Sequence, residues 1–344
     1  MSEAVLVVSF GGPEKPEDVM PFLENVTRGR GIPRERLLGV AEHYQSMGGR
    51  SPINEITRRQ AEGLRAALAK RGDARPVYVG QRNWHPFLED VLRRMRDDGI
   101  VAATALCTSA YGSESSLERY VAAVAAAREK VGPDAPTVRF VAPWFDHPGF
   151  IAAIAARVRE AQPDPSAAWV FTAHSIPCAM AKDSVYVEEL RTAAGLVARE
   201  LGREDWTLAF TSRSGNPRDP WLEPDFAGLM PKLAAAGVKG VFAIPSGFVA
   251  DHVEVLFDLD VDAKAAAGKA GLAFGRAATV GDHPLFLEMM ADVVLAGPPA
   301  VASLAESSAA TLLRDGLPLE RVGKDSASCL CFPGAEAPPC RRPR

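Results

Sequence analysis

The chain has 344 residues, of which 47% are hydrophobic and 24% are charged, and its formal net charge is −4. These values are typical of a globular protein of one or two domains with a sizeable core, and they exclude the basic surface of a nucleic-acid binder. No secretory signal follows the first residue and no apolar run is long enough to span a membrane, so we expect a cytoplasmic protein.

Short apolar runs alternate with helical patterns along most of the chain. Strands are expected at residues 4–10, 76–80, 101–107, 138–142, 168–173, 206–211, 240–245 and 271–277. Helices are expected between them, including those at 16–26, 87–97, 149–161, 187–201, 225–236 and 283–296. This alternation predicts an α/β protein with two doubly wound parallel sheets of four strands each.

A Pro-containing crossover at 143–148 separates the two halves of the chain. We therefore expect an N-terminal domain at residues 1–146, a C-terminal domain at 147–298, and a C-terminal helix with a Cys-rich tail at 299–344. The five cysteines are an odd number, and three of them crowd the tail. This distribution argues against the disulfide framework of a secreted protein.

Side chains suited to ligand binding follow the strands of the first half. Phe10 ends the first strand before a Gly-Gly-Pro turn, where it would either cover a ligand or pack in the core; the GxGxxG spacing of a dinucleotide site is absent. Arg28 and Arg30 lie on a glycine-rich loop, which suits carboxylate or phosphate binding, and Ser51 lies in a second such turn. The ends of the second and third strands carry Arg82, Asn83, Trp84, Cys107 and Tyr111.

Two strand ends of the second half are followed by histidines, His174 after the strand at 168–173 and His252 after the strand at 240–245. Open α/β sheets bind their ligands outside the carboxyl ends of their strands. A lone histidine at such a position is more often a structural residue, but two of them in one chain favour a functional site.

The segment 251–262 is acidic. If it forms an α-helix, three of its carboxylates lie four residues apart on one face: Glu254, Asp258 and Asp262. These charges repel one another unless protons or cations are near, and a row of this kind suits proton transfer or the binding of a hard cation. The other interpretation is a solvated helix face, in which Asp251 is the N-cap and Glu254 completes a capping box.

The motifs at residues 173–177, Ala-His-Ser-Ile-Pro, and 247–260, Gly-Phe-Val-Ala-Asp-His-Val-Glu-Val-Leu-Phe-Asp-Leu-Asp, resemble the two defining motifs of the ferrochelatases. These enzymes insert ferrous iron into a porphyrin late in haem synthesis. Further segments are similar to family motifs and occur in family order, at residues 9–13, 48–53, 80–84, 108–111 and 220–224. Residues 23–30 are most similar to actinobacterial-type members of the family.

The resemblance implies two Rossmann-like domains with the porphyrin in the cleft between them. It implies that His174 and Glu254 face each other across the porphyrin centre as the catalytic residues. These two, together with Asp258 and Asp262, would carry iron or protons. The residues expected to contact the porphyrin are Phe10, Arg28, Arg30, Ser51, Arg82, Asn83, Trp84, Tyr111 and Trp221.

The same resemblance implies the substrates and partners. The substrates would be Fe²⁺ and either coproporphyrin III or protoporphyrin IX, between which the sequence does not decide. No nucleotide, nucleic acid or transmembrane segment is implied. Transient contact with a membrane surface or with another protein of the haem pathway stays open.

Three of the cysteines lie in the tail, Cys329, Cys331 and Cys340. Some ferrochelatases hold a [2Fe–2S] cluster with C-terminal cysteines and one internal cysteine, and this tail resembles theirs in position. In actinobacterial-type members the internal ligand falls where this chain has Leu117, so the fourth ligand would be Cys107, Cys178 or a non-cysteine group. We favour Cys107, because it lies on the strand that leads into the same loop. The alternative is a Pro-rich tail whose cysteines are incidental.

Two other functions fit the same residues. A cobalt chelatase of the same superfamily would also use histidine and carboxylates, and a comparison of Fe²⁺ with Co²⁺ as substrate separates the two. A non-catalytic protein that binds haem or porphyrin would need an axial ligand but no path for protons, so the acidic row argues against it.

Overall fold

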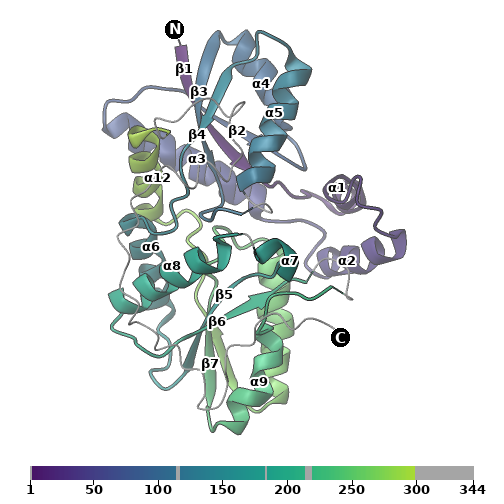
Figure 1. The fold of residues 1–344 in the computed structure, drawn as a ribbon, viewed down its shortest axis with the longest axis vertical. Helices are drawn as coiled ribbons and strands as arrows, with labels where there is room; N and C mark the ends of the chain where they lie inside the picture. The colour runs from purple at the N-terminus through teal and green to yellow at the C-terminus, as the bar shows by residue number, and fades with distance from the viewer. Residues whose placement is uncertain (1, 114–116, 183, 214–218, 299–344) are drawn as a thin grey trace.

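The computed structural model describes residues 2–113, 117–182, 184–213 and 219–298 (Figure 1). Its strands form two four-stranded sheets, both entirely parallel, with the orders β2-β1-β3-β4 and β6-β5-β7-β8. The first sheet contains β1 (Ser2–Ser9), β2 (Val77–Gln81), β3 (Ile100–Cys107) and β4 (Thr137–Phe140). The second contains β5 (Ala168–His174), β6 (Thr207–Thr211), β7 (Gly240–Ile244) and β8 (Ala273–Arg276). The expected α/β class with two doubly wound parallel sheets is confirmed.

Helices connect the strands and flank both sheets (Figure 1). The first half contains η1 (Pro16–Asp18), α1 (Val19–Val26), α2 (Arg34–Ser46), α3 (Ile53–Lys70), α4 (Leu88–Asp97) and α5 (Arg119–Val131). The second contains α6 (Pro148–Ala161), α7 (Cys178–Ala181), α8 (Tyr186–Glu200), α9 (Phe226–Ala235), α10 (Val253–Val255), the π-helix η3 (Leu256–Ala263), α11 (Lys264–Lys269) and α12 (Pro284–Ala296). In the part of the chain that is described, no helix is both long and apolar enough to cross a membrane. The expected cytoplasmic location stays a prediction.

The central strands are buried on both faces. The run from Ala4 to Val8 in β1 has no exposed surface. This strand pairs with β2 on one side and with β3 on the other, so that Val5 lies opposite Val77 and Thr104. Strands covered on both faces carry nearly continuous apolar side chains, and for this reason the apolar runs were sufficient to locate them.

Each sheet has a switch point at which its strand order reverses. β1 lies between β2 and β3, and β5 lies between β6 and β7. At such a point the connections from the two central strands diverge, and the space outside their carboxyl ends is where open α/β sheets bind ligands. The loops after β5 and β7 contain His174 and the acidic segment 251–262, so both lie at the switch point of the second sheet.

Helix α2 is not evident from the sequence. Its buried side chains are Leu37, Ala41 and Tyr44, whereas Leu38 and Val40 of the same helix are exposed. The apolar residues therefore do not mark a single face, and the helical period is weak. Figure 1 shows α1 and α2 at the right of the view, beside the space between the two sheets.

The last described helix joins the two halves. Although α12 follows β8, it packs against both α6 and α3. Gly63 of α3 has no room for a side chain, because a Cβ there would lie 2.3 Å from the Leu287 Cδ1. The Gln60 Nε2 donates to the carbonyl oxygens of Gly281 (2.8 Å) and Val249 (3.3 Å). Part of the C-terminal half thus packs on the N-terminal half, and the expected domain boundaries stay a prediction.

Two further polar contacts cross this junction. The Tyr111 hydroxyl donates to the Ser246 carbonyl oxygen (2.8 Å), and the Gly112 amide donates to the Glu189 Oε2 (2.6 Å). Burial raises the pKa of Glu189 to about 8, the bond from Gly112 lowers it, and the charge of Asp146 raises it further. In the folded protein this carboxyl therefore keeps its proton at neutral pH.

We predict that Glu189→Gln makes the stability of the fold less sensitive to rising pH. In the unfolded chain this carboxyl ionises near its ordinary pKa of 4.5, whereas in the folded protein it keeps its proton up to about 8. The wild type therefore loses unfolding free energy as the pH rises through this window, by up to about 1.4 kcal/mol for each pH unit. The amide of the variant has no such proton to hold.

Chemical denaturation at about pH 5 and about pH 8 measures this effect. The control is Glu62→Gln, which changes an exposed carboxylate on α3 that does not act on Glu189. The same drop in unfolding free energy between the two pH values in the wild type, the control and Glu189→Gln would contradict the prediction.

Candidate active site

His174 is the last residue of β5 and lies opposite Thr211 of β6 in the sheet. Its Nδ1 contacts the Ser175 carbonyl oxygen. Since a carbonyl oxygen can only accept, Nδ1 carries the proton of this contact, and in the neutral ring Nε2 then holds the lone pair. The Tyr186 hydroxyl donates to the His174 carbonyl oxygen (3.1 Å), which holds the backbone at this point. The ring therefore offers Nε2 as a base or a metal ligand.

The acidic helix begins at Val253, and His252 is its N-cap. The His252 Nδ1 accepts a hydrogen bond from the Val255 amide (3.4 Å). Burial lowers the pKa of His252, while the charge of Glu254 raises it and that of His174 lowers it. His252 thus lies within electrostatic range of both Glu254 and His174, although the two histidines come from different strand ends.

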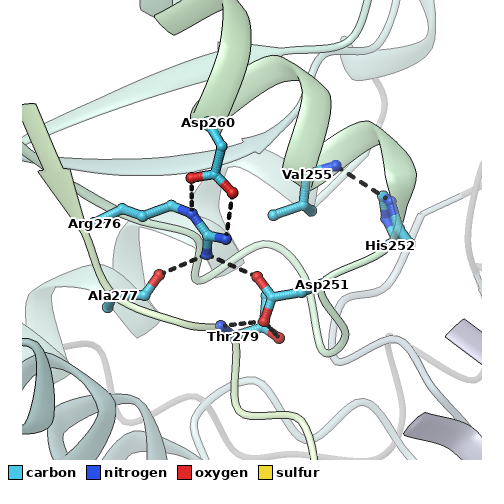
Figure 2. A network of polar contacts seen from close by, with 7 residues as sticks. All are labelled: Asp251, His252, Val255, Asp260, Arg276, Ala277 and Thr279. Carbon is cyan, nitrogen blue, oxygen red and sulfur yellow. Dashed lines mark hydrogen bonds and ion pairs between the residues drawn. The ribbon is translucent and has the colours of Figure 1, made fainter. Parts of the chain in front are cut away.

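Asp251 does not cap this helix. Its carboxylate instead accepts hydrogen bonds from Arg276 (2.7 Å) and from the Thr279 hydroxyl (2.8 Å), as Figure 2 shows. The alternative expectation of a capping box between Asp251 and Glu254 is therefore wrong. The expectation fails because Arg276, which lies far along the chain, binds the Asp251 carboxylate.

The rest of the acidic segment is the π-helix η3 and not the α-helix expected over 251–262. A π-helix contains more residues per turn than an α-helix, and single π turns are frequent at functional sites. Because side chains four residues apart lie near one another in both forms, the sequence spacing does not reveal the difference.

The carboxylates of this helix lie at different depths. Glu254 and Asp258 are partly buried, and Asp262 is exposed. Burial raises the pKa of Asp258 to about 6, although the Ser212 hydroxyl donates to this carboxylate and lowers it. The charges of Glu254 and Asp262 raise the pKa of Asp258, and that of His174 lowers it. The three carboxylates form a row, called here the acidic row, that leads from the neighbourhood of His174 to solvent.

Aromatic side chains of the first half pack against the start of the acidic helix. The ring centroids of Phe10 and Trp84 each lie 6.2 Å from that of Phe22, at interplanar angles of 72° and 84°. Tyr44 of α2 lies 5.9 Å from Phe22, and the same apolar cluster includes Val253. Phe10 and Trp84, which the sequence placed at the porphyrin, thus lie beside the acidic helix.

Helix α2 supplies two contacts that the sequence does not reveal. Burial raises the pKa of Tyr44 and the charge of Glu254 raises it further, so this phenol lies near that carboxylate. The His43 ring stacks on Phe257 of η3, with centroids 3.9 Å apart and an interplanar angle of 10°. Helix α2 therefore closes over the π-helix. Predicting either contact would have required recognising α2 from its weak helical period.

Arginine side chains gather near Phe10. The Arg82 Cζ lies 5.9 Å from the centroid of the Phe10 ring. Burial lowers the pKa of Arg82, Tyr120 raises it, and the charges of Arg119 and Arg30 lower it. Neither Arg82 nor Arg30 pairs with a carboxylate of the described residues. These three arginines, called here the arginine cluster, include Arg119, which the sequence reasoning missed.

Two other expected porphyrin residues lie beside these groups. The Asn83 Nδ2 donates to the Phe10 carbonyl oxygen (3.1 Å), so Asn83 holds the loop that carries Phe10. Trp221 pairs with Pro177 in an isolated β-bridge, which places it next to the loop after His174. Both residues therefore lie near the candidate site. Asn83 acts there by holding the loop that carries Phe10.

The remaining expected porphyrin residues differ in their surroundings. Arg28 is exposed, and Ser51 is buried against Gly12. Tyr111 is only 2% exposed and lies in the core between the two halves, and its expected contact with the porphyrin stays a prediction. Asn54, which was not singled out from the sequence, donates to the Gly12 carbonyl oxygen (2.8 Å) and accepts from the Gly12 amide (3.0 Å), and so fixes the loop after β1.

A cavity of about 420 Å³ lies between the two halves. Ser51 and Asn54 line it from the first half, and Leu256 of η3 lines it from the second. A larger hollow of about 700 Å³ lies beside Ser2 and Ile100, at the amino ends of β1 and β3. The smaller cavity borders the acidic helix at Leu256, but neither His174 nor Glu254 lines it.

The residues expected to hold an iron–sulfur cluster are only partly described. Cys329, Cys331 and Cys340 lie outside the described residues. Cys107 is 3% exposed, and burial raises the pKa of its thiol, so it does not fit the role of an accessible thiolate ligand. Cys178, at the start of α7, is partly exposed. Among the described residues, no three His, Cys, Asp or Glu side chains converge on a common metal position.

Sequence comparison gives the chain its relatives. The family model described as ferrochelatase matches residues 2–297. The chain is 45% identical to a coproporphyrin III ferrochelatase of Mycobacterium ulcerans over 99% of this chain and 96% of that protein. It is 46% identical to a coproporphyrin III ferrochelatase of Mycolicibacterium smegmatis (85% and 88% of the two chains) and to a ferrochelatase of Rhodopirellula baltica (85% of each).

Solved structures agree on the fold. The Bacillus subtilis SirB structure with Fe³⁺ aligns with a TM-score of 0.54 and 11% identity, over 86% of this chain and 95% of that one. A cobalt complex of the sirohydrochlorin chelatase SirB from the same species gives a TM-score of 0.53 at 10% identity, over 86% and 94%. At this identity the likeness concerns the fold alone. On the family match and the curated relatives, the chain belongs to the ferrochelatase family.

Proposed function

We propose that this protein inserts Fe²⁺ into coproporphyrin III and releases two protons. One observation carries the proposal: His174 and the acidic row follow β5 and β7, which are neighbouring strands of one sheet. The coproporphyrin III ferrochelatases that are similar over nearly the whole chain support the choice of porphyrin. The arginine cluster supports it too, because coproporphyrin III carries four propionates and guanidinium groups bind carboxylates in pairs of hydrogen bonds.

The chemistry requires bases near the porphyrin centre. A porphyrin must lose two pyrrole N–H protons as the metal enters, and a positioned side chain has to accept them. The Nε2 of His174 holds a lone pair for one such transfer. The Glu254 carboxylate has no hydrogen bond or ion pair within the described part of the chain, so it is available to a proton or to Fe²⁺.

The acidic row then accounts for the exit of protons and the arrival of iron. Asp258 has a pKa of about 6, so it takes up and releases a proton near neutral pH. Asp262 is exposed and continues the row to solvent. Carboxylate oxygens such as these suit a divalent cation that has to be passed on. Thiolate ligands would bind it more tightly. The macrocycle would lie against Phe10, Trp84 and Trp221.

We expect His174→Ala and Glu254→Gln each to lower turnover with Fe²⁺ at least about 100-fold, the usual contribution of a general base. Porphyrin affinity should change little, because both residues act on protons or metal. Anaerobic kinetics with coproporphyrin III and protoporphyrin IX, and porphyrin binding by fluorescence quenching, measure the two quantities. Co²⁺ in place of Fe²⁺ tests the cobalt chelatase alternative. Wild-type turnover in either variant, or a loss confined to affinity, would refute its assigned role.

Arg82→Ala should raise the dissociation constant of coproporphyrin III roughly 10-fold, the size of one charge-assisted hydrogen bond. Its tetramethyl ester has no carboxylates and should bind both proteins alike. The matched control is Arg94→Ala, since the Arg94 Cζ lies 5.8 Å from the Tyr78 ring centroid, in a contact like that of Arg82 with Phe10. If Arg82→Ala weakens the binding of coproporphyrin III and of its ester equally, this arginine does not bind propionates.

We further propose that the tail cysteines hold a [2Fe–2S] cluster. The resemblance of the tail to that of cluster-bearing ferrochelatases supports it. Protein purified anaerobically should then be red-brown, with iron and acid-labile sulfide in similar amounts. Substitution by serine should bleach it at each of three positions, Cys329, Cys331 and Cys340. Because Cys178 is partly exposed and Cys107 is buried, Cys178→Ser should bleach it as well and Cys107→Ser should not. Colourless protein without labile sulfide after reconstitution would exclude the cluster.

A further inference from the structure

Arg276, the last residue of β8, connects two acidic side chains at the acidic helix (Figure 2). Its Nε and Nη2 donate to the two carboxylate oxygens of Asp260, at 2.6 and 2.8 Å. Its Nη1 donates to the Asp251 Oδ1 (2.7 Å) and to the Ala277 carbonyl oxygen (3.0 Å). The arginine side chain is 15% exposed. All three guanidinium nitrogens are therefore engaged in a partly desolvated network.

Asp251 is held from its other side as well. The Thr279 amide and hydroxyl donate to the Asp251 Oδ2 at 3.1 and 2.8 Å. Both oxygens of this carboxylate are thus fixed at the residue that directly precedes the N-cap, His252. Asp260 lies inside the π-helix η3. One guanidinium group therefore links the residue before the helix to a residue within its π segment.

This link constrains the register of the helix. A π turn contains one more residue than an α turn and is much the rarer form. A return to the α form would change the rotation at each residue of this segment, and so the position of Asp260 relative to Asp251. Such a change would pull Asp260 out of its two bonds with Arg276 and would shift the acidic row relative to His174. A bidentate pair has a strict geometry, so it opposes this change.

We propose that Arg276 is a positioning residue for metal insertion, because its fork of hydrogen bonds fixes the π register of the acidic helix. In that register Asp258 lies within electrostatic range of both Glu254 and His174. Arg276 forms no hydrogen bond with these three side chains, so it acts through the helix that carries two of them. The inference rests on the function proposed above for His174 and the acidic row.

The test is Arg276→Met, which removes the fork but keeps an unbranched side chain in its place. Turnover with Fe²⁺ should fall roughly 10- to 100-fold, as for other residues that orient metal-handling groups. The dissociation constant of coproporphyrin III should stay unchanged, since Phe10, Trp84 and the arginine cluster belong to the first half and Trp221 lies outside the acidic helix. A merely destabilised protein would show a lower Tm without this split between turnover and porphyrin binding.

Arg203→Met is the matched control. Arg203 is 21% exposed, its Cζ lies 5.2 Å from the Trp169 ring centroid, and its guanidinium bonds Asp205 and two carbonyl oxygens. Its loss should therefore lower the Tm to a similar extent, but turnover per folded molecule should stay at the wild-type value. Equal turnover per folded molecule in the two methionine variants would overturn the inference.

Two milder variants keep the inference testable if Arg276→Met folds poorly. Asp260→Asn breaks the fork at an exposed residue and should lower turnover, whereas its control Asp205→Asn should not. Arg276→Lys keeps the positive charge without the fork, so it should recover little turnover. Full recovery by lysine, or full activity in Asp260→Asn, would mean that the fork does not position the acidic row.

Glu254→Gln, assayed alongside, separates this inference from the proposed function. If Glu254→Gln keeps wild-type turnover, the role of the acidic row fails and the positioning role fails with it. If Glu254→Gln is inactive while Arg276→Met is fully active, the positioning role alone is refuted. Loss of turnover in both variants, with porphyrin binding intact, supports the two together.

Discussion

The candidate site depends on one apolar contact, the packing of the first half of the chain on the first turn of the acidic helix. Phe22 is at its centre, with Phe10, Trp84 and Tyr44 around it and Val253 on the other side. The loop after β1 and the helix after β7 have no neighbouring strands in common, so no backbone pairing brings them together. Burial of these side chains contributes to that association, together with the packing of α12 on α3 and the hydrogen bonds across the junction. Without it the two strand ends would be two incomplete sites.

A second constraint is electrostatic. Five carboxylates lie between residues 251 and 262, and partial burial makes their mutual repulsion stronger than it would be in water. The structure separates them into two groups. Asp251 and Asp260 pair with Arg276, whereas Glu254, Asp258 and Asp262 form the row. Burial and the charges of Glu254 and Asp262 together raise the pKa of Asp258 to about 6. A carboxyl that exchanges a proton near neutral pH is what a proton path requires.

The sequence was sufficient for features that depend on local pattern and failed where distant residues decide. The strands were predictable because central parallel strands are continuous apolar runs. The place of His174 at the end of β5 was predictable for the same reason, whereas the roles of His174 and Glu254 stay predictions. The capping box was wrong because Arg276, some twenty-five residues away, takes the Asp251 carboxylate. The π-helix was missed because a four-residue spacing fits both helical forms, and Tyr44 was missed because α2 has exposed as well as buried apolar residues.

The two halves of the site also differ in the sign of their charge. The arginine cluster belongs to the first half and the acidic row to the second. Under the proposed function the substrates have the complementary charges, since the propionates are anions and Fe²⁺ is a cation. Each would be attracted to one half and repelled by the other. The apolar contact around Val253 holds the two halves together. It therefore also holds a positively charged surface, the arginine cluster, opposite a negatively charged one, the acidic row.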